Sequence, residues 1–166
     1  MERIKSFQIN HNILEPGFYI SREDDGVITY DLRTRKPNAG DYMDNATMHS
    51  VEHMFATYAR NSEESENIIY FGPMGCRTGF YVIFKGDLDS TNIVELMKEM
   101  FKFIAEYEGE VPGADPRSCG NYLDQNLPMA KYEANLFVKI LKENPCFDYP
   151  QSKRINTEKG LTFFDS

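Results

Sequence analysis

The segment TMHSVEHMFATYAR, residues 47–60, holds metal-binding residue types at a spacing that suits a helix. His49 and His53 lie four positions apart, with Glu52 between them. Each residue of a helix advances by about 100°, so the two imidazoles lie about 40° apart, one turn from each other, and can reach one ion. In this H-x-x-E-H arrangement the histidines bind a divalent metal and the glutamate transfers protons. Because the whole chain has 3 histidines, we predict a metal site rather than an ordinary polar helix face.

A catalytic site of this kind needs a third protein ligand from elsewhere in the chain. Cys119 in SCGN and Cys76 in PMGC are both candidates, because a neighbouring glycine lets the backbone approach a crowded site. The remaining cysteine, Cys146, has no partner pattern. An odd count of 3 cysteines without a secretion signal favours free thiols over disulfides. Two histidines and a thiolate with one open position suit Zn²⁺ or Fe²⁺.

The composition is that of a globular protein with an acidic surface. With 166 residues and no repeat or linker, the chain is predicted to form a single domain, residues 1–166. Its 18 basic and 26 acidic residues give a net charge of −8, which disfavours a nucleic-acid partner. No apolar run approaches the roughly 20 residues that cross a bilayer, and no secretion signal is recognisable. We therefore predict no membrane partner and a cytoplasmic location.

The elements that must position these residues can be assigned from periodicity. Runs of β-branched and aromatic residues predict strands over residues 4–9, 17–22, 26–33, 67–72 and 78–86. Apolar residues at helical spacing predict helices over residues 45–60, from about 90 onward, and over 129–143. We expect an α+β fold in which a mostly antiparallel β-sheet packs against about three helices as a two-layer sandwich.

Five motifs, in order along nearly the whole chain, resemble the LuxS family of S-ribosylhomocysteine lyases. They are SFQINH (6–11), YDLRTRKPN (30–38), HSVEH (49–53) followed by Arg60, PMGCRTGFY (73–81) and SCGNYLDQNL (118–127). One such motif is weak evidence, whereas five in register are specific.

The resemblance implies a role for each matching residue. One divalent metal per subunit, natively Fe²⁺ with Zn²⁺ or Co²⁺ also possible, would be held by His49, His53 and Cys119. The two acid/base groups would be Glu52 and Cys76. The residues that position the substrate would be Ser6, His11, Arg33 and Arg60. The resemblance further implies a homodimer with active sites at the interface.

The implied reaction cleaves S-ribosylhomocysteine to homocysteine and 4,5-dihydroxy-2,3-pentanedione, the precursor of the quorum-sensing signal autoinducer-2. Breaking the thioether requires the sugar carbonyl to migrate until it lies β to the sulfur. Each migration removes a proton beside a carbonyl and returns one to the next carbon, which calls for two acid/base groups and a Lewis-acid metal. A thiol in electropositive surroundings can act as one of them. The reaction involves no redox change, so we expect no nicotinamide or flavin.

Three positions depart from the family pattern: Tyr70 stands where the family has Asp, Gly72 where it has Ser, and Gln125 where it often has His. These positions flank the pocket, so we expect them to affect substrate affinity more than the metal. Two other interpretations remain. A metallopeptidase would use Glu52 to activate a metal-bound water, and a non-catalytic metal-binding module would turn over no substrate. A lyase would release a thiol from S-ribosylhomocysteine, whereas a metallopeptidase would produce new peptide amino termini.

Overall fold

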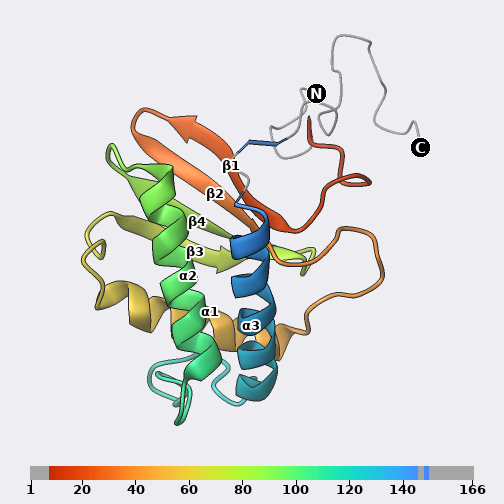
Figure 1. Cartoon of the computed structure of the whole chain (residues 1–166). Helices are drawn as coiled ribbons and strands as arrows, with labels where there is room; N and C mark the ends of the chain where they lie inside the picture. The colour runs from red at the N-terminus through yellow and green to blue at the C-terminus, as the bar shows by residue number, and fades with distance from the viewer. Residues whose placement is uncertain (1–7, 146–147, 150–166) are drawn as a thin grey trace.

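The structure is a computed structural model, and it describes residues 8–145 and 148–149. Within these residues the elements are, in chain order, β1 (Gly17–Asp24), β2 (Val27–Arg33), α1 (Asn45–Arg60), β3 (Ile68–Pro73), β4 (Gly79–Lys85), α2 (Ser90–Glu106) and α3 (Leu127–Glu143). The helices form a layer on one face of the sheet (Figure 1). The predicted α+β class is confirmed.

The sheet is antiparallel throughout, with the strand order β1-β2-β4-β3. Its register aligns Phe18, Leu32 and Phe80 across three strands, and all three are buried in the core beneath the helices. At Gly79, where β4 begins, an added Cβ would lie 2.4 Å from the carbonyl oxygen of Leu32. Glycine therefore allows β4 to approach the end of β2, next to the turn that carries Cys76.

Helix α1 has the bounds that the sequence predicts. It begins after Asp44, whose carboxylate accepts hydrogen bonds of 2.8 Å from both the backbone N–H and the hydroxyl of Thr47. Its apolar side faces the core, where Phe55 stacks on Phe71 of β3 with ring centroids 3.6 Å apart. This orientation leaves His49 and His53 half-buried on the opposite side of the helix.

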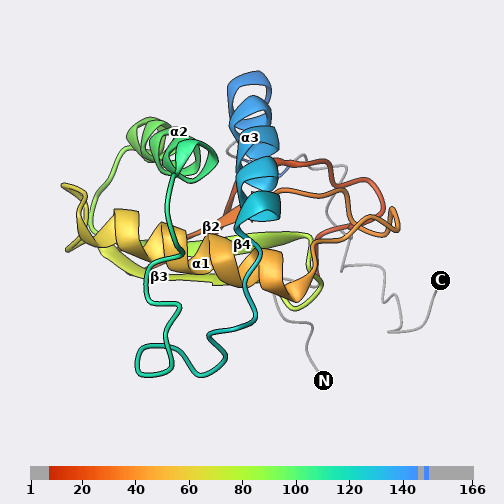
Figure 2. The same ribbon diagram turned by 90° about the horizontal axis from the view of Figure 1, so that it is seen from below.

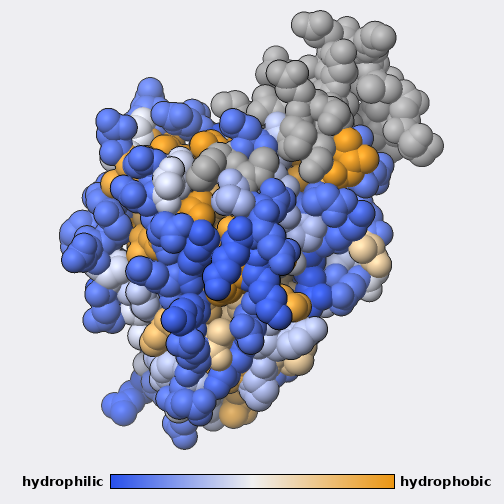
Figure 3. Space-filling view, viewed as in Figure 1, coloured by the Kyte–Doolittle hydropathy of each residue, from blue (hydrophilic) through white to orange (hydrophobic). Residues whose placement is uncertain are grey.

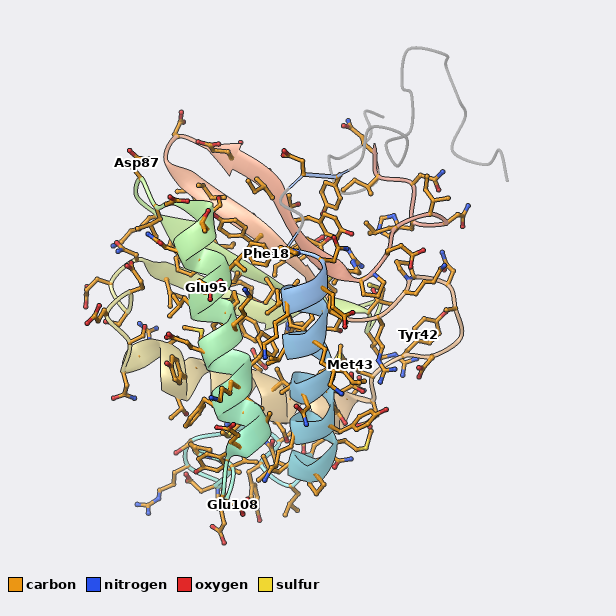
Figure 4. The ribbon with its side chains drawn as sticks, viewed as in Figure 1. Phe18, Tyr42, Met43, Asp87, Glu95 and Glu108 are labelled. Carbon is orange, nitrogen blue, oxygen red and sulfur yellow. The ribbon has the colours of Figure 1, made fainter. Side chains whose placement is uncertain are left out.

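Helices α2 and α3 stand side by side, and α1 runs across their lower ends alongside β3 (Figures 1 and 2). The outward faces of α2 and α3 are largely hydrophilic (Figure 3). Phe18 lies between the sheet and the helices, whereas Asp87 and Glu108 lie at the edge of the molecule (Figure 4). Helix α3 begins two residues before the predicted position 129, because Asn126 caps it by accepting a 3.2 Å hydrogen bond from the Met129 N–H, and a proline is tolerated in its first turn. No helix in the described part of the chain has a span long and apolar enough to cross a membrane.

The opposite face of the sheet carries buried residues of its own. Tyr19 and Asp31 lie on this face, because they alternate with the core residues along β1 and β2. Ile9, which forms an isolated bridge, and Leu14 pack with Tyr19 and Tyr149 in a small cluster. Of the strand predicted over residues 4–9, residues 4–7 lie outside the described residues, and residues 8 and 9 form a 3-10 turn and an isolated bridge instead of a regular strand.

The cap of α1 yields a stability prediction. We expect Asp44→Ala to lower the free energy of unfolding by about 1 kcal/mol, because the hydrogen bonds to Thr47 are lost. The backbone hydrogen bond from Thr47 holds the pKa of Asp44 below its usual value. The contribution of this carboxylate is therefore fully present above the ordinary Asp pKa and is lost as the pH falls through the lower folded-state pKa.

Asp44→Asn is the matched control, since it keeps an accepting oxygen but cannot titrate. It should stay near wild type at neutral pH and lack the share of acid destabilisation that Asp44 provides. Urea unfolding at neutral and acidic pH measures both effects. An Asn variant as unstable as the Ala variant at neutral pH would contradict the capping role.

Candidate metal centre

The structure brings His49, His53 and Cys119 together at one point. The two histidines come from α1, and the cysteine comes from the loop between α2 and α3, residues 107–126. The His49 and His53 Nε2 atoms lie 3.0 Å apart, and the Cys119 Sγ lies 3.3 Å from the His49 Nε2. One ligand atom from each of the three residues lies within 4.8 Å of the others, and no other group of His, Cys, Asp and Glu in the described residues converges in this way.

The tautomers of the two histidines follow from their hydrogen bonds. The His49 Nδ1 lies 2.8 Å from the carbonyl oxygen of Asp124, and the His53 Nδ1 lies 2.8 Å from that of Pro112. A carbonyl oxygen only accepts, so each Nδ1 carries the hydrogen and each neutral ring presents an unprotonated Nε2. The Nε2 atom of His49 thus faces the Cys119 thiol, and a ring nitrogen of His53 lies within 4.8 Å of both. Two imidazole nitrogens and a thiolate are a donor set for Zn²⁺ or Fe²⁺, so the residues present fit the expected metal.

The loop of residues 107–126 supplies both carbonyls and the thiol. Figure 2 shows it descending from α2, passing across α1 and returning to α3. The Asp115 side chain accepts hydrogen bonds from the Arg117 and Ser118 N–H groups, at 2.9 and 3.2 Å, and its carbonyl oxygen accepts one of 3.0 Å from the Cys119 N–H. Hydrogen bonds from Ser118 and Arg117 hold the pKa of Asp115 below its usual range. This turn fixes the backbone that presents the Cys119 thiol.

Two further side chains, Ser50 and Gln125, join α1 to the loop beside His49, and sequence reasoning did not find this contact. The Ser50 hydroxyl donates a 2.7 Å hydrogen bond to the Gln125 Oε1 and accepts one of 2.8 Å from the Asn126 N–H. The Gln125 Nε2 lies 3.2 Å from the His49 Nδ1. Gln125, one of the three departures from the family pattern, therefore lies against a candidate metal ligand. Only the return of the loop to α1 brings the two together.

Glu52 and Arg60 lie beside the histidine cluster. Both line a cavity of about 510 Å³ together with His53 and the loop residues Pro112 and Gly113. At Gly113 an added Cβ would lie 3.3 Å from the His53 Nδ1, and its φ of +72° also favours glycine. The loop can therefore pass close to His53.

Cys76 lies in a different cavity, of about 610 Å³, that is also lined by His11, Arg33 and Tyr81. Its thiol is exposed, with the Sγ 3.0 Å from the Thr78 Oγ1. This cavity and the cavity beside His53 share no lining residue among the described part of the chain. The third candidate ligand at the histidine cluster is therefore Cys119 and not Cys76. Ser6, also predicted to contact substrate, lies outside the described residues.

Arg33 is held beside Cys76 by a buried ion pair. Its Nη2 and Nε donate to the two carboxylate oxygens of Asp31 at 2.6 and 3.2 Å. Its Nη1 donates to the Thr78 Oγ1 at 2.7 Å and lies 3.9 Å from the Cys76 Sγ. Burial disfavours the guanidinium charge, but the Asp31 carboxylate more than offsets this and raises the pKa of Arg33. Sequence reasoning missed Asp31, although its two-residue spacing from Arg33 on a strand indicates a shared face.

Tyr70 and Gly72, the other two departures, are physically coupled. A Cβ at position 72 would clash with the Tyr70 hydroxyl oxygen, so the tyrosine ring occupies the space that a side chain would need. Tyr70 and Arg60 both line a small cavity of about 180 Å³ between α1 and β3. The two substitutions therefore fit the fold as a pair.

Comparison with known proteins agrees with the motifs found in the sequence. The family model described as S-ribosylhomocysteinase (LuxS) matches residues 4–146. An S-ribosylhomocysteine lyase from Clostridium beijerinckii is 54% identical over 149 residues, which cover 87% of this chain and 94% of that protein. Those of Finegoldia magna and Borreliella burgdorferi are 50% and 47% identical and cover 87% and 85% of this chain, and 97% and 93% of their own lengths. The resemblance found in the sequence is confirmed, and the chain belongs to the LuxS family.

Proposed function

We propose that this protein cleaves S-ribosylhomocysteine to homocysteine and 4,5-dihydroxy-2,3-pentanedione. The observation that carries the proposal is the convergence of His49, His53 and Cys119 beside Glu52, in a chain of this family. The names of the relatives, all S-ribosylhomocysteine lyases, support the substrate. A thiol as third donor, and a second thiol beside an arginine, favour this chemistry over peptide hydrolysis.

The metal would be held by His49, His53 and Cys119 as a divalent ion. When bound, such an ion supplies Lewis acidity toward the oxygens of the sugar. The protein keeps the two imidazoles in the metal-binding tautomer through the carbonyls of Asp124 and Pro112. The residues themselves then have to orient the substrate and move its protons.

Glu52 and Cys76 are the proposed acid/base groups. Glu52 lines the same cavity as His53, where it can take a proton from a carbon of the bound sugar. Cys76 lies beside the guanidinium of Arg33, and a positive charge favours the thiolate form of a cysteine. Two groups that approach the carbon chain from different sides can pass protons between neighbouring carbons. The last proton removal then expels the homocysteine thiolate by β-elimination.

The proposed active site is completed by a second copy of the chain. The support is the separation of the two halves of the chemistry. Glu52 and His53 line one cavity, and His11, Arg33 and Cys76 line another without a shared residue. In a symmetric dimer the thiol cavity of one protomer can face the metal cavity of its partner. Both cavities would then contribute to each of two equivalent sites.

Removal of a metal ligand is the first test. We expect His53→Ala to lose most bound divalent metal, because two remaining protein ligands cannot hold the ion in a partly open site. Elemental analysis of the purified protein measures this. Cys76→Ser, whose change lies in the other cavity, is the control and should keep its metal. A His53→Ala protein with one metal per chain would show that the assignment is wrong.

The second test separates proton transfer from metal binding. We expect Cys76→Ser and Glu52→Gln to keep their metal but lose about a hundredfold or more in kcat, because neither replacement can act as a base at neutral pH. The measurement is anaerobic release of free thiol from S-ribosylhomocysteine. Wild-type protein that releases no thiol would refute the proposed function, and a metal-replete Cys76→Ser protein with near-normal release would refute the two-base mechanism.

Mixing two inactive variants tests the shared site. A dimer of one Cys76→Ser chain and one His53→Ala chain keeps one complete site if the metal and the thiol come from different protomers. Random reassembly makes half of the dimers mixed, each with one good site of two, so about a quarter of wild-type activity should return. If each chain contains a whole site, the mixture stays inactive. A mixture of Cys76→Ser with Glu52→Gln should also regain activity, whereas His53→Ala with Glu52→Gln should not.

A further inference from the structure

Tyr149 is a buried residue that lies beyond the part of the chain matched by the family model. The match ends at residue 146, and Tyr149 lies three positions later. Its side chain is 4% exposed and stacks on Tyr19 of β1, with ring centroids 4.8 Å apart. Ile9 and Leu14 complete this cluster on the face of the sheet opposite the helices. Tyr149 therefore lies against β1, next to the strand β2 that carries Arg33.

The Tyr149 hydroxyl reaches the ion pair behind Cys76. It donates a 2.5 Å hydrogen bond to the Asp31 Oδ2, the same oxygen that accepts from the Arg33 Nη2 at 2.6 Å. Burial raises the pKa of Tyr149, and the nearby Asp31 charge raises it further, so the hydroxyl remains a donor at neutral pH. Tyr149, Asp31, Arg33 and Cys76 thus form a continuous chain of polar contacts.

The strength of this chain follows from its burial. Asp31 and Arg33 are 0% and 2% exposed, and a buried ion pair is stable only when its remaining hydrogen-bonding groups have partners. Without the Tyr149 hydroxyl, the Asp31 carboxylate would lose one hydrogen-bond donor. Its negative charge would then attract the Arg33 guanidinium more strongly. The field of Arg33 at the Cys76 Sγ would weaken, and water would enter if the ring were also removed.

We propose that Tyr149 is a positioning residue for the Cys76 half of the active site, acting through Asp31 and Arg33. Its hydroxyl holds the Asp31 carboxylate so that the Arg33 Nη1 remains directed at the Cys76 thiol and the Thr78 hydroxyl. The inference rests on the proposed function for its catalytic consequence, but the contact itself does not depend on turnover. It assigns a role in the active site to the chain beyond the family match.

The test is the pH dependence of Cys76 alkylation by iodoacetamide in the full-length, metal-loaded protein, with the modified peptide identified by mass spectrometry. The other titratable groups that line the Cys76 cavity are Arg33, His11, Tyr42 and Tyr81. None of these changes in Tyr149→Phe, which keeps the stacked ring and removes only the hydroxyl. We expect its alkylation rate at neutral pH to fall about three- to tenfold, because a less firmly held Arg33 guanidinium favours the reactive thiolate of Cys76 less. Tyr149→Ala should fall further.

Turnover gives an independent measurement. In Tyr149→Phe we expect kcat to fall at neutral pH and to recover toward wild type at higher pH, with little change in metal content. A residue that merely stabilises the fold would lower kcat equally at every pH. Tyr132→Phe removes a hydroxyl from an exposed tyrosine of α3 and should match wild type in both assays.

Arg33→Gln calibrates the alkylation assay, because it removes the charge directly and should slow Cys76 at least as much as Tyr149→Phe. If Arg33→Gln slows alkylation while both Tyr149 variants keep the wild-type profile, the inference is wrong. Should Tyr149→Ala fail to fold, Tyr149→Phe alone decides. Absence of thiol release by wild-type protein would refute the proposed function and would leave the alkylation result to stand by itself.

Discussion

The centre of this structure is the convergence of the Nε2 atoms of His49 and His53, 3.0 Å apart. In neutral rings whose Nδ1 carries the hydrogen, the two Nε2 lone pairs repel each other, so the arrangement suits a bound cation. The fold enforces it through carbonyls of the loop between α2 and α3, which fix each Nδ1–H. Helix α1 is anchored on β3 through Phe55 and begins at the Asp44 cap. This orientation turns the face with His49 and His53 toward the loop between α2 and α3.

A second constraint is the alternation of side chains along β2. Leu32 faces the helices, so Asp31 and Arg33 face the other side of the sheet, where they form a buried pair. The metal candidates lie on α1 and its covering loop, whereas the thiol of Cys76 lies beside Arg33. A single chain therefore divides the groups needed for the chemistry between two cavities. This division is the structural reason to consider two copies of the chain as the functional unit.

The departures from the family pattern are accommodated by local packing. The Tyr70 ring occupies the space beside Gly72, so a side chain at position 72 would require the exposed tyrosine ring to move. Gln125 is bonded to Ser50 and touches the ring edge of His49. Neither change disturbs the convergence of His49, His53 and Cys119. The donor set of the candidate metal centre is thus compatible with variation in its surroundings.

The sequence by itself determined the class of fold, the bounds of α1 and the pairing of His49 with His53, because helical and strand periodicities are local properties. It also pointed to the family through motifs whose spacing needs no tertiary model. Residue types alone left the choice between Cys119 and Cys76 open, since both are thiols beside glycines. The family resemblance implied Cys119, and the tertiary structure places Cys119 beside the two histidines. Loop closure brings Cys119 to the histidines from 70 positions away and Tyr149 to Asp31 from 118. Such contacts depend on chain packing, which no local pattern encodes.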